Sequence, residues 1–212
     1  MIKTRELVFI TGKTGSGKST LFRKMLEDKS RLVIFDTISE YEDLNPPYPA
    51  LFVHEISQLY DYFSKNHTRG FRVIFDPEDP EQILELKDGS KITVFEEAAK
   101  LIYNNLGSMI IGIEEISNFM TGSRAPEYLR KIIRFGRHSA LSLYATTQRP
   151  ADVHPLVRAQ ITKLISFKQH EPRDIDWLKQ VIGEEAQGLK DLKPYAWGRP
   201  MVKGVHYKEY VL

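Results

Sequence analysis

The chain has 212 residues, of which 42% are hydrophobic and 27% are charged, an ordinary globular composition with room for one α/β domain. Cysteine is absent, which excludes disulfide scaffolds, thiol catalysis and cysteine-ligated metal sites. No apolar run approaches the roughly 18–20 residues that a bilayer crossing needs, and we expect a soluble cytoplasmic protein.

Positive charge is concentrated in the second half of the chain. Residues 1–121 carry 14 Lys/Arg and 19 Asp/Glu, whereas residues 122–212 carry 16 and nine. The richest part, residues 122–173, holds ten basic and three acidic residues. Such an excess favours polyanions. A solvated basic face, or basic residues paired with acids of the first half, would have the same composition.

Short β-branched runs alternate with amphipathic stretches along the chain. Strands are predicted at 7–10, 32–35, 71–75, 109–113, 141–145 and 164–167. Helices are predicted at 18–26, 56–65, 92–104, 126–135 and 174–182. This alternation predicts an α/β fold with a mainly parallel central sheet and helices on both faces.

Neither a repeat nor a linker divides the chain, so we predict a single domain over residues 1–212. Its core covers about 6–173, and residues 174–212 form a C-terminal extension. A short hairpin around Gly198–Pro200 or Lys203-Gly204 is expected in that extension.

A phosphate-binding loop follows the first predicted strand. The segment GKTGSGKS fits the spacing G-x-x-x-x-G-K-[ST] between a strand and a helix. Its backbone N–H groups and the helix N-terminus suit phosphate oxygens, Lys18 suits the β- and γ-phosphates of ATP, and the Ser19 hydroxyl suits Mg²⁺. The predicted nucleotide-binding residues are Gly12, Lys13, Thr14, Gly15, Ser16, Gly17, Lys18, Ser19 and Thr20.

Two acids follow the fourth predicted strand, as in a Walker B element. We predict that Glu114 holds Mg²⁺ through its coordinated water. Glu115 is the predicted general base, which orients the water that attacks the γ-phosphate. Alternatively, both acids only open the following helix, whose N-terminal dipole they complement.

Gln148 ends the strand that follows the acidic pair in the chain. A glutamine there can hydrogen-bond both the γ-phosphate and the attacking water, and so report whether the terminal phosphate is present. The run Thr-Thr-Gln also makes an ordinary exit from a strand into a turn. After a phosphate loop and two acids, the sensor role is the favoured interpretation. Asp36 also ends a predicted strand, where it can approach the nucleotide.

The P-loop, the acidic pair Glu114-Glu115 and the segment GRHSALSLYATTQRP together resemble the FtsK–HerA superfamily of P-loop ATPases, which have a RecA/ASCE-like core. The compact form is similar to genome-packaging ATPases of membrane-containing viruses and to Zot-like phage assembly proteins. The resemblance covers about residues 6–173. It implies a homo-oligomeric, usually hexameric ring that couples ATP hydrolysis to threading DNA, with a capsid or portal partner. For a viral protein, it also implies a location in the host cytoplasm or the virion.

Two features depart from the family pattern. The usual acidic pair is Asp-Glu, whereas the first acid here is Glu114. The chain also lacks room for the N-terminal barrel of HerA proteins or the C-terminal winged helix of FtsK proteins. Partners or core loops would therefore direct it to particular DNA.

The resemblance also implies roles for arginines. Arg137, just ahead of the sensor strand, is the predicted arginine finger that completes a neighbouring subunit's site, and Arg134 is the next candidate. The loop at 118–126 is a candidate channel loop that carries Arg124. Arg149 and Arg158 are further candidates for contact with DNA phosphates, followed by Lys163 and Lys168. Each of these residues could instead belong to an ordinary solvated surface.

The sequence therefore predicts an ATP-hydrolysing motor that translocates or packages DNA. Two alternatives remain open. One is a Zot-like, nucleotide-gated assembly or export protein. The other is a kinase of the nucleoside monophosphate type, although an acidic pair suits water activation and a kinase must exclude water.

Overall fold

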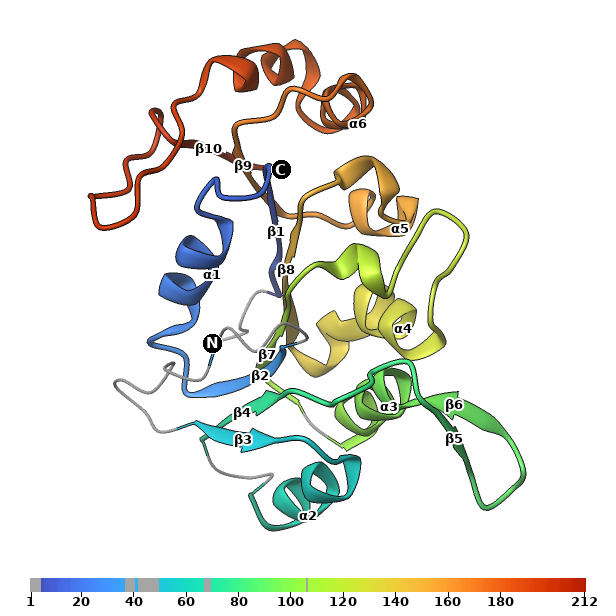
Figure 1. The fold of residues 1–212 in the computed structure, drawn as a ribbon. Coiled ribbons are helices and arrows are strands. Elements are labelled where there is room, and N and C mark those ends of the chain that lie inside the picture. The colour runs from blue at the N-terminus through green and yellow to red at the C-terminus, as the bar shows by residue number, and fades with distance from the viewer. Residues whose placement is uncertain (1–4, 37–40, 42–49, 67–69, 106) are drawn as a thin grey trace. The chain divides into compact units, whose positions relative to one another are not determined.

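The computed structural model describes residues 5–36, 41, 50–66, 70–105 and 107–212 (Figure 1). Eight strands form one mainly parallel sheet with helices around it, which confirms the predicted fold class. The sheet order is β10 (Tyr207–Val211), β9 (Lys163–Phe167), β1 (Leu7–Thr11), β8 (Leu141–Thr147), β7 (Met109–Ile113), β2 (Arg31–Phe35), β4 (Phe71–Phe75), β3 (Leu51–Val53). Two further strands, β5 (Ile83–Glu85) and β6 (Lys91–Thr93), pair only with each other, in an antiparallel hairpin.

The chain divides into two compact units. Unit 1 comprises residues 1–5, 25–114 and 126–143, and unit 2 comprises residues 6–24, 115–125 and 144–212. The organisation as a single domain over 1–212 stays a prediction.

Unit 1 is built on parallel strand pairs. β2 pairs with both β4 and β7, and β3 pairs with β4. Every residue of β4 is buried, as the near-continuous apolar pattern of a strand covered on both faces predicts. The unit also contains α2 (Ile56–Asn66), α3 (Val94–Asn105) and α4 (Glu127–Phe135). In its core, the ring of Phe35 lies 4.8 Å from that of Phe95, centroid to centroid.

A buried arginine in unit 1 donates hydrogen bonds to backbone carbonyls. Arg72 is 2% exposed, and its Nη1 donates to the carbonyl oxygens of Leu26, Glu27 and Lys29 at 3.2, 2.7 and 2.9 Å. These carbonyls lie at or just after the C-terminal end of α1 (Lys18–Leu26), where the helix has no N–H groups to offer. Arg5 donates in the same way to the carbonyls of Ile132 and Ile133 near the end of α4.

Unit 2 surrounds the parallel pair of β1 and β9, with β10 added antiparallel at the outer edge of β9. The indole of Trp177, on α6 (Pro172–Ile182), lies 5.5 Å from the ring of Phe9 on β1, centroid to centroid. Most of α1 also belongs to this unit. The remaining helices of the unit are short or 3₁₀-helical: η1 (Ile116–Asn118), η3 (Pro150–Asp152), α5 (Pro155–Arg158) and η4 (Gly183–Asp191).

Several elements differ from the sequence prediction. The helix predicted at 92–104 begins at Val94, because residues 91–93 pair with β5. The three-residue strands are too short to show a periodic pattern and were not predicted. In the tail, a turn at Lys203–Gly204 is present, with the N–H of Gly204 donating to the carbonyl of Tyr207 over 2.7 Å. The strand after this turn pairs with β9 instead of forming a hairpin within the tail.

The helices of the described ranges are short, and the longest, α3, has 12 residues. None of them has the length and apolar character that crossing a bilayer would require. The cytoplasmic location itself stays a prediction.

Replacing Arg72 with methionine should lower the free energy of unfolding by about 3 kcal/mol, because three buried carbonyls lose a charged donor. Urea denaturation followed by circular dichroism measures this loss. Lys65→Met on α2 is the matched control, since Lys65 is exposed and its replacement should change stability by less than about 0.5 kcal/mol. Equal stabilities of the two variants would contradict the role of Arg72.

Candidate nucleotide site

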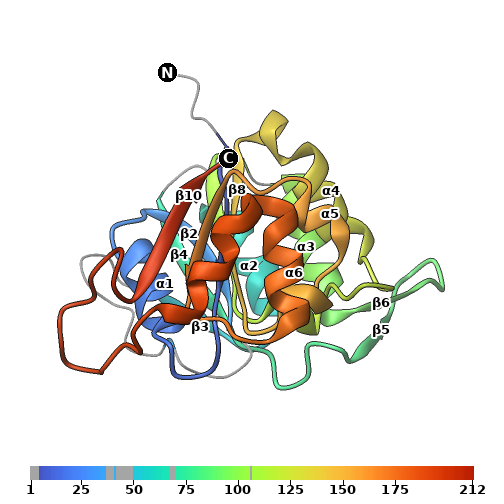
Figure 2. The same ribbon diagram turned by 90° about the horizontal axis from the view of Figure 1, so that it is seen from above.

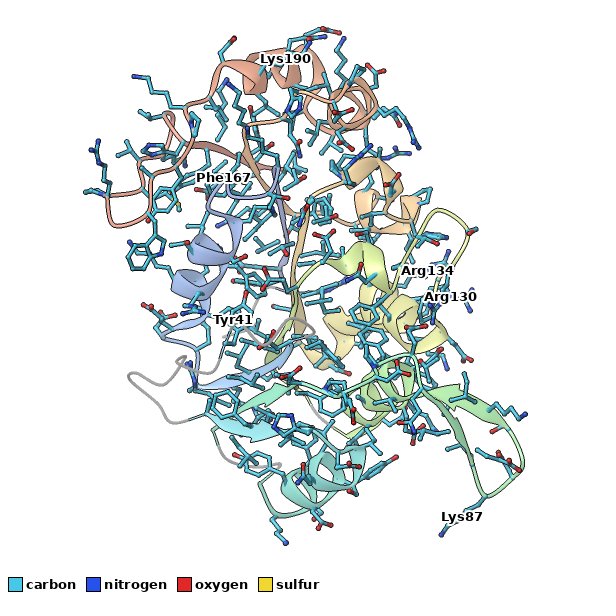
Figure 3. All side chains as sticks on the ribbon, viewed as in Figure 1. Tyr41, Lys87, Arg130, Arg134, Phe167 and Lys190 are labelled. Atoms are coloured by element: carbon cyan, nitrogen blue, oxygen red, sulfur yellow. The ribbon has the colours of Figure 1, made fainter. Side chains whose placement is uncertain are left out.

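The glycine-rich loop begins directly after β1 and is supported by the end of β9. A Cβ atom at Gly12 would lie 2.6 Å from the Cβ of Phe167, closer than two carbons can approach. The N–H of the next residue, Lys13, donates to the carbonyl of Lys168 over 3.4 Å. Only glycine therefore fits at position 12, where the loop leaves the sheet beside Phe167 (Figure 3).

The loop ends at Gly17, one residue before α1. Gly17 has a φ of 101°, in a region that side chains disfavour. A Cβ atom at this position would also lie 2.9 Å from Cδ1 of Tyr195 and 2.9 Å from Cε of Met201. The C-terminal extension thus packs directly against the phosphate loop, a contact that the sequence pattern did not predict.

Lys18 and Ser16 both turn toward the interior of the loop. Lys18 is 7% exposed, and its Nζ donates to the carbonyl oxygen of Lys13 over 3.2 Å. The hydroxyl of Ser16 is buried and has no hydrogen-bond partner among the residues that the structure describes. Leaving such a group unpaired costs roughly 1–3 kcal/mol. A phosphate oxygen bound in the loop would accept from the Ser16 hydroxyl, which fits the predicted triphosphate.

Glu115 is held in place by three donors. Its Oε1 accepts from the hydroxyls of Ser117 and Thr147 at 2.5 and 2.6 Å, and its Oε2 accepts from the N–H of Gln148 at 3.0 Å. The Glu115 backbone has a φ of 51°, which is strained for a residue with a side chain, and its N–H donates to the Thr146 hydroxyl over 3.1 Å. The Glu115 carboxylate is therefore oriented by β8 and by Ser117 of η1, at whose N-terminus Glu115 lies, and its role as general base stays a prediction.

Gln148 connects the end of β8 with the phosphate loop. Its Oε1 accepts from the hydroxyl of Thr14 over 2.6 Å, while its backbone N–H binds Glu115. Thr14, Gln148 and Glu115 thus form one hydrogen-bonded chain within unit 2. The structure brings these three predicted site residues together, and the sensor role of Gln148 itself stays a prediction.

Glu114 lies at the end of β7 in unit 1 and is 4% exposed. The phenol of Tyr41 donates a hydrogen bond to its carboxylate, and the Tyr41 N–H donates to Oδ2 of Asp36 over 3.0 Å. Tyr41 thereby links the acids at the ends of β7 and β2. Asp36 ends its strand as predicted, and its approach to the nucleotide stays a prediction.

The predicted magnesium ligands have suitable chemistry. Ser19 offers a hydroxyl and Glu114 a carboxylate, and Mg²⁺ prefers oxygen ligands. Within the described ranges, no group of three or more His, Asp or Glu side chains could hold a metal ion by itself. In nucleotide sites Mg²⁺ keeps several waters and shares the substrate's phosphates, so few protein oxygens are needed. The joint action of Ser19 and Glu114 on one ion stays a prediction.

Arg149, a predicted DNA contact, forms an ion pair within unit 2. Its Nε lies 3.1 Å from Oδ2 of the buried Asp174 on α6, and the other oxygen of Asp174 accepts from the N–H of Ala151 over 3.2 Å. Burial raises the pKa of the Asp174 carboxyl, and the Ala151 N–H and Arg149 act in the opposite direction. Arg149 therefore joins η3 to α6, whatever it contacts besides.

The other predicted arginines lie in different surroundings. The Arg158 guanidinium lies 5.8 Å from the ring centroid of Trp177. Arg124 is half-buried, and its N–H donates to the Thr121 hydroxyl over 3.2 Å. Arg137 lies in the 3₁₀ helix η2 (Gly136–Ser139), and its side chain is outside the described part of the chain. Their roles in DNA contact and as arginine finger stay predictions.

Several residues that contact the predicted site residues were not identified from the sequence. Ser117, Tyr41 and Gln169 were not predicted, although Gln169 is buried and its Nε2 donates to the hydroxyl of Thr11 at the end of β1 over 2.8 Å. Polar residues directly after predicted parallel strands were the available signal, and Gln169 fits it. Tyr41 and Ser117 carry no spacing that could have identified them.

The site can now be compared with known proteins. A solved genome packaging NTPase B204 from Sulfolobus turreted icosahedral virus 2, in complex with ATP-gammaS, is 23% identical, with a TM-score of 0.68 over 98% of this chain and 92% of that chain. VirB4 of Thermoanaerobacter pseudethanolicus is 13% identical, with a TM-score of 0.59 over 92% and 86%. These likenesses show the fold. No curated protein sequence matches the chain.

The family model described as "Helicase HerA, central domain" matches residues 6–183. This range contains the phosphate loop, both strand-end acids and Gln148, which are the features that carried the predicted resemblance to the FtsK–HerA superfamily. The chain belongs to the HerA central-domain family and is a P-loop ATPase.

Proposed function

We propose that this ATPase uses the energy of ATP hydrolysis to move DNA through a ring of identical subunits, with packaging of a genome as the favoured setting. The main support for this proposal is the position of the Glu115 carboxylate. Hydrogen bonds fix it and join it through Gln148 to Thr14 of the phosphate loop. A carboxylate held beside the phosphate loop suits activation of water. In support, similar solved structures include a genome packaging NTPase.

The chemistry follows from the site's donors and acceptors. Loop N–H groups and Lys18 bind the phosphates, and Glu115 accepts the proton of the water that attacks the γ-phosphate. Bound Mg²⁺, near Ser19 and Glu114, would supply charge neutralisation on the phosphate oxygens. The Ser117 and Thr147 hydroxyls keep the Glu115 carboxylate oriented through the reaction.

In this proposal, Gln148 couples ATP hydrolysis to a conformational change at the end of β8. Its side chain binds Thr14 of the phosphate loop, while its backbone binds the catalytic carboxylate. A γ-phosphate oxygen would compete with Gln148 Oε1 for the hydrogen bond from the Thr14 hydroxyl, and its loss after hydrolysis would restore the Thr14–Gln148 contact. The end of β8 then differs between the triphosphate and diphosphate states, as a motor requires.

In the proposed ring, arginine from a neighbouring subunit stabilises the transferring phosphoryl group, with Arg137 as the first candidate and Arg134 as the second. Arg130 and Arg134 occupy successive turns on one side of α4 and are exposed (Figure 3). An exposed basic pair at this spacing suits either a partner subunit or DNA phosphates. Arg124, Arg149 and Arg158 remain the proposed DNA contacts of unit 2.

The motor is tested by measuring steady-state ATPase activity with and without double-stranded DNA, together with the oligomeric state in ATP by size-exclusion chromatography. We expect DNA to raise turnover severalfold and ATP to promote a ring, because neighbouring subunits complete each other's sites. An ATPase rate that does not change when DNA is added would favour the interpretation as a nucleotide-gated assembly protein. Transfer of phosphate to a nucleoside monophosphate would instead identify a kinase.

Lys18→Ala should weaken ATP binding at least about tenfold, because a charged donor to the phosphates is lost. Isothermal titration calorimetry measures the affinity. Lys24→Ala is the control, since Lys24 is exposed near the opposite end of α1 and its loss should leave binding unchanged. Unchanged ATP affinity in Lys18→Ala would count against the phosphate loop as the nucleotide site.

Glu115→Gln should bind ATP normally but hydrolyse it about 10²–10⁴-fold more slowly, because the amide cannot accept the proton of the attacking water. Single-turnover hydrolysis of bound ATP measures this step without product release. Glu55→Gln, at the exposed start of α2, provides the matched control. A Glu115→Gln variant with near-normal turnover would move the general base to another residue.

A further inference from the structure

The segment of residues 193–206 follows η4, and its fold presents an exposed indole. The segment holds three basic residues and no acid. In both ribbon views it lies beside α1 (Figures 1 and 2). The segment contains Trp197, which is 90% exposed. The other tryptophan of the chain, Trp177, is 5% exposed.

Hydrogen bonds fix the shape of this segment. Its base is closed by the N–H of Lys193, which donates to the carbonyl of Val205 over 2.9 Å. At its tip the N–H of Arg199 donates to the carbonyl of Ala196 over 3.2 Å, across a turn in which Gly198 has a φ of 80°. Trp197 occupies that turn, so a defined backbone presents it to solvent.

The segment is also attached to the phosphate loop. Tyr195 and Met201 pack against Gly17, the residue before Lys18, so close that a Cβ at Gly17 would lie 2.9 Å from each of them. Tyr195 is held from its other side by an edge-on ring contact with His206, 5.9 Å between centroids. Trp197 therefore lies two residues from a side chain that contacts the phosphate site.

We propose that the segment of residues 193–206 is the nucleoside-binding part of the ATP site, with the Trp197 indole stacking on the nucleobase. A nucleobase stacked on an indole buries one face of each ring, and such stacking tolerates any base. The basic residues of the segment suit an anionic ligand. Because the segment packs against Gly17 of the phosphate loop, the stacked base is more consistent with the bound nucleotide than with DNA.

This inference rests on the proposed nucleotide site and is tested by comparing ATP with inorganic tripolyphosphate, which lacks the nucleoside. Isothermal titration calorimetry with Mg²⁺ gives both affinities for the full chain. In Trp197→Ala, ATP should bind about tenfold more weakly, and tripolyphosphate should bind as before. Trp197→Phe, which keeps an aromatic face, should recover most of the ATP affinity, and Phe135→Ala, an exposed aromatic on α4, is the control.

Tryptophan fluorescence provides a second readout without mutation. Because Trp177 is buried, acrylamide should quench mainly Trp197. ATP should protect the indole from acrylamide, whereas tripolyphosphate should leave quenching unchanged.

Each other outcome overturns the assignment. If Trp197→Ala lowers the affinities for ATP and tripolyphosphate by the same factor, Trp197 acts only through the phosphate loop. Intact ATP affinity, combined with lost binding of a single-stranded oligonucleotide or lost self-association, would assign Trp197 to DNA or to a subunit interface. A wild-type chain that binds neither ATP nor tripolyphosphate would refute the nucleotide site itself, and this inference with it.

Discussion

The hydrogen bonds that hold the Glu115 carboxylate are the constraint on which the proposed catalytic arrangement depends. A general base must keep one orientation while charge develops, and a free glutamate side chain has several rotatable bonds. Here two hydroxyls and one backbone N–H restrict it, and the strained backbone of Glu115 turns its side chain onto β8. In the proposed mechanism, Thr147 is therefore a positioning residue for the general base.

The phosphate loop is constrained in a different way, by close packing at both of its ends. Gly12 lies against Phe167 of β9, and Gly17 lies against Tyr195 and Met201 of the C-terminal extension. The loop is therefore packed at both ends against other parts of the same unit, and within it the N–H of Ser16 donates to the carbonyl of Lys13 over 3.2 Å. The extension thus contacts the loop that is predicted to bind phosphate.

The sequence predicted the elements whose pattern is local. The strands at 71–75 and 109–113 and the helix at 18–26 agree with the structure residue for residue, because buried apolar runs and the glycine-rich motif mark their ends. The acid pair and Gln148 followed from chain order along a parallel sheet. The contacts of Tyr41 with Glu114 and of Tyr195 with Gly17 join residues far apart in the chain. No periodicity records such contacts, so they had to be found in space.

The placement of the arginines has a consequence for handling the protein. The charge of Arg72 is buried against backbone carbonyls and is poorly accessible to counterions, whereas Arg130 and Arg134 are exposed to them. Raising the ionic strength therefore screens the charges of the surface arginines. It leaves the hydrogen bonds between Arg72 and the carbonyls at the end of α1 in place. Added salt is therefore expected to weaken the proposed contacts of the surface arginines with DNA before it weakens the contacts of Arg72.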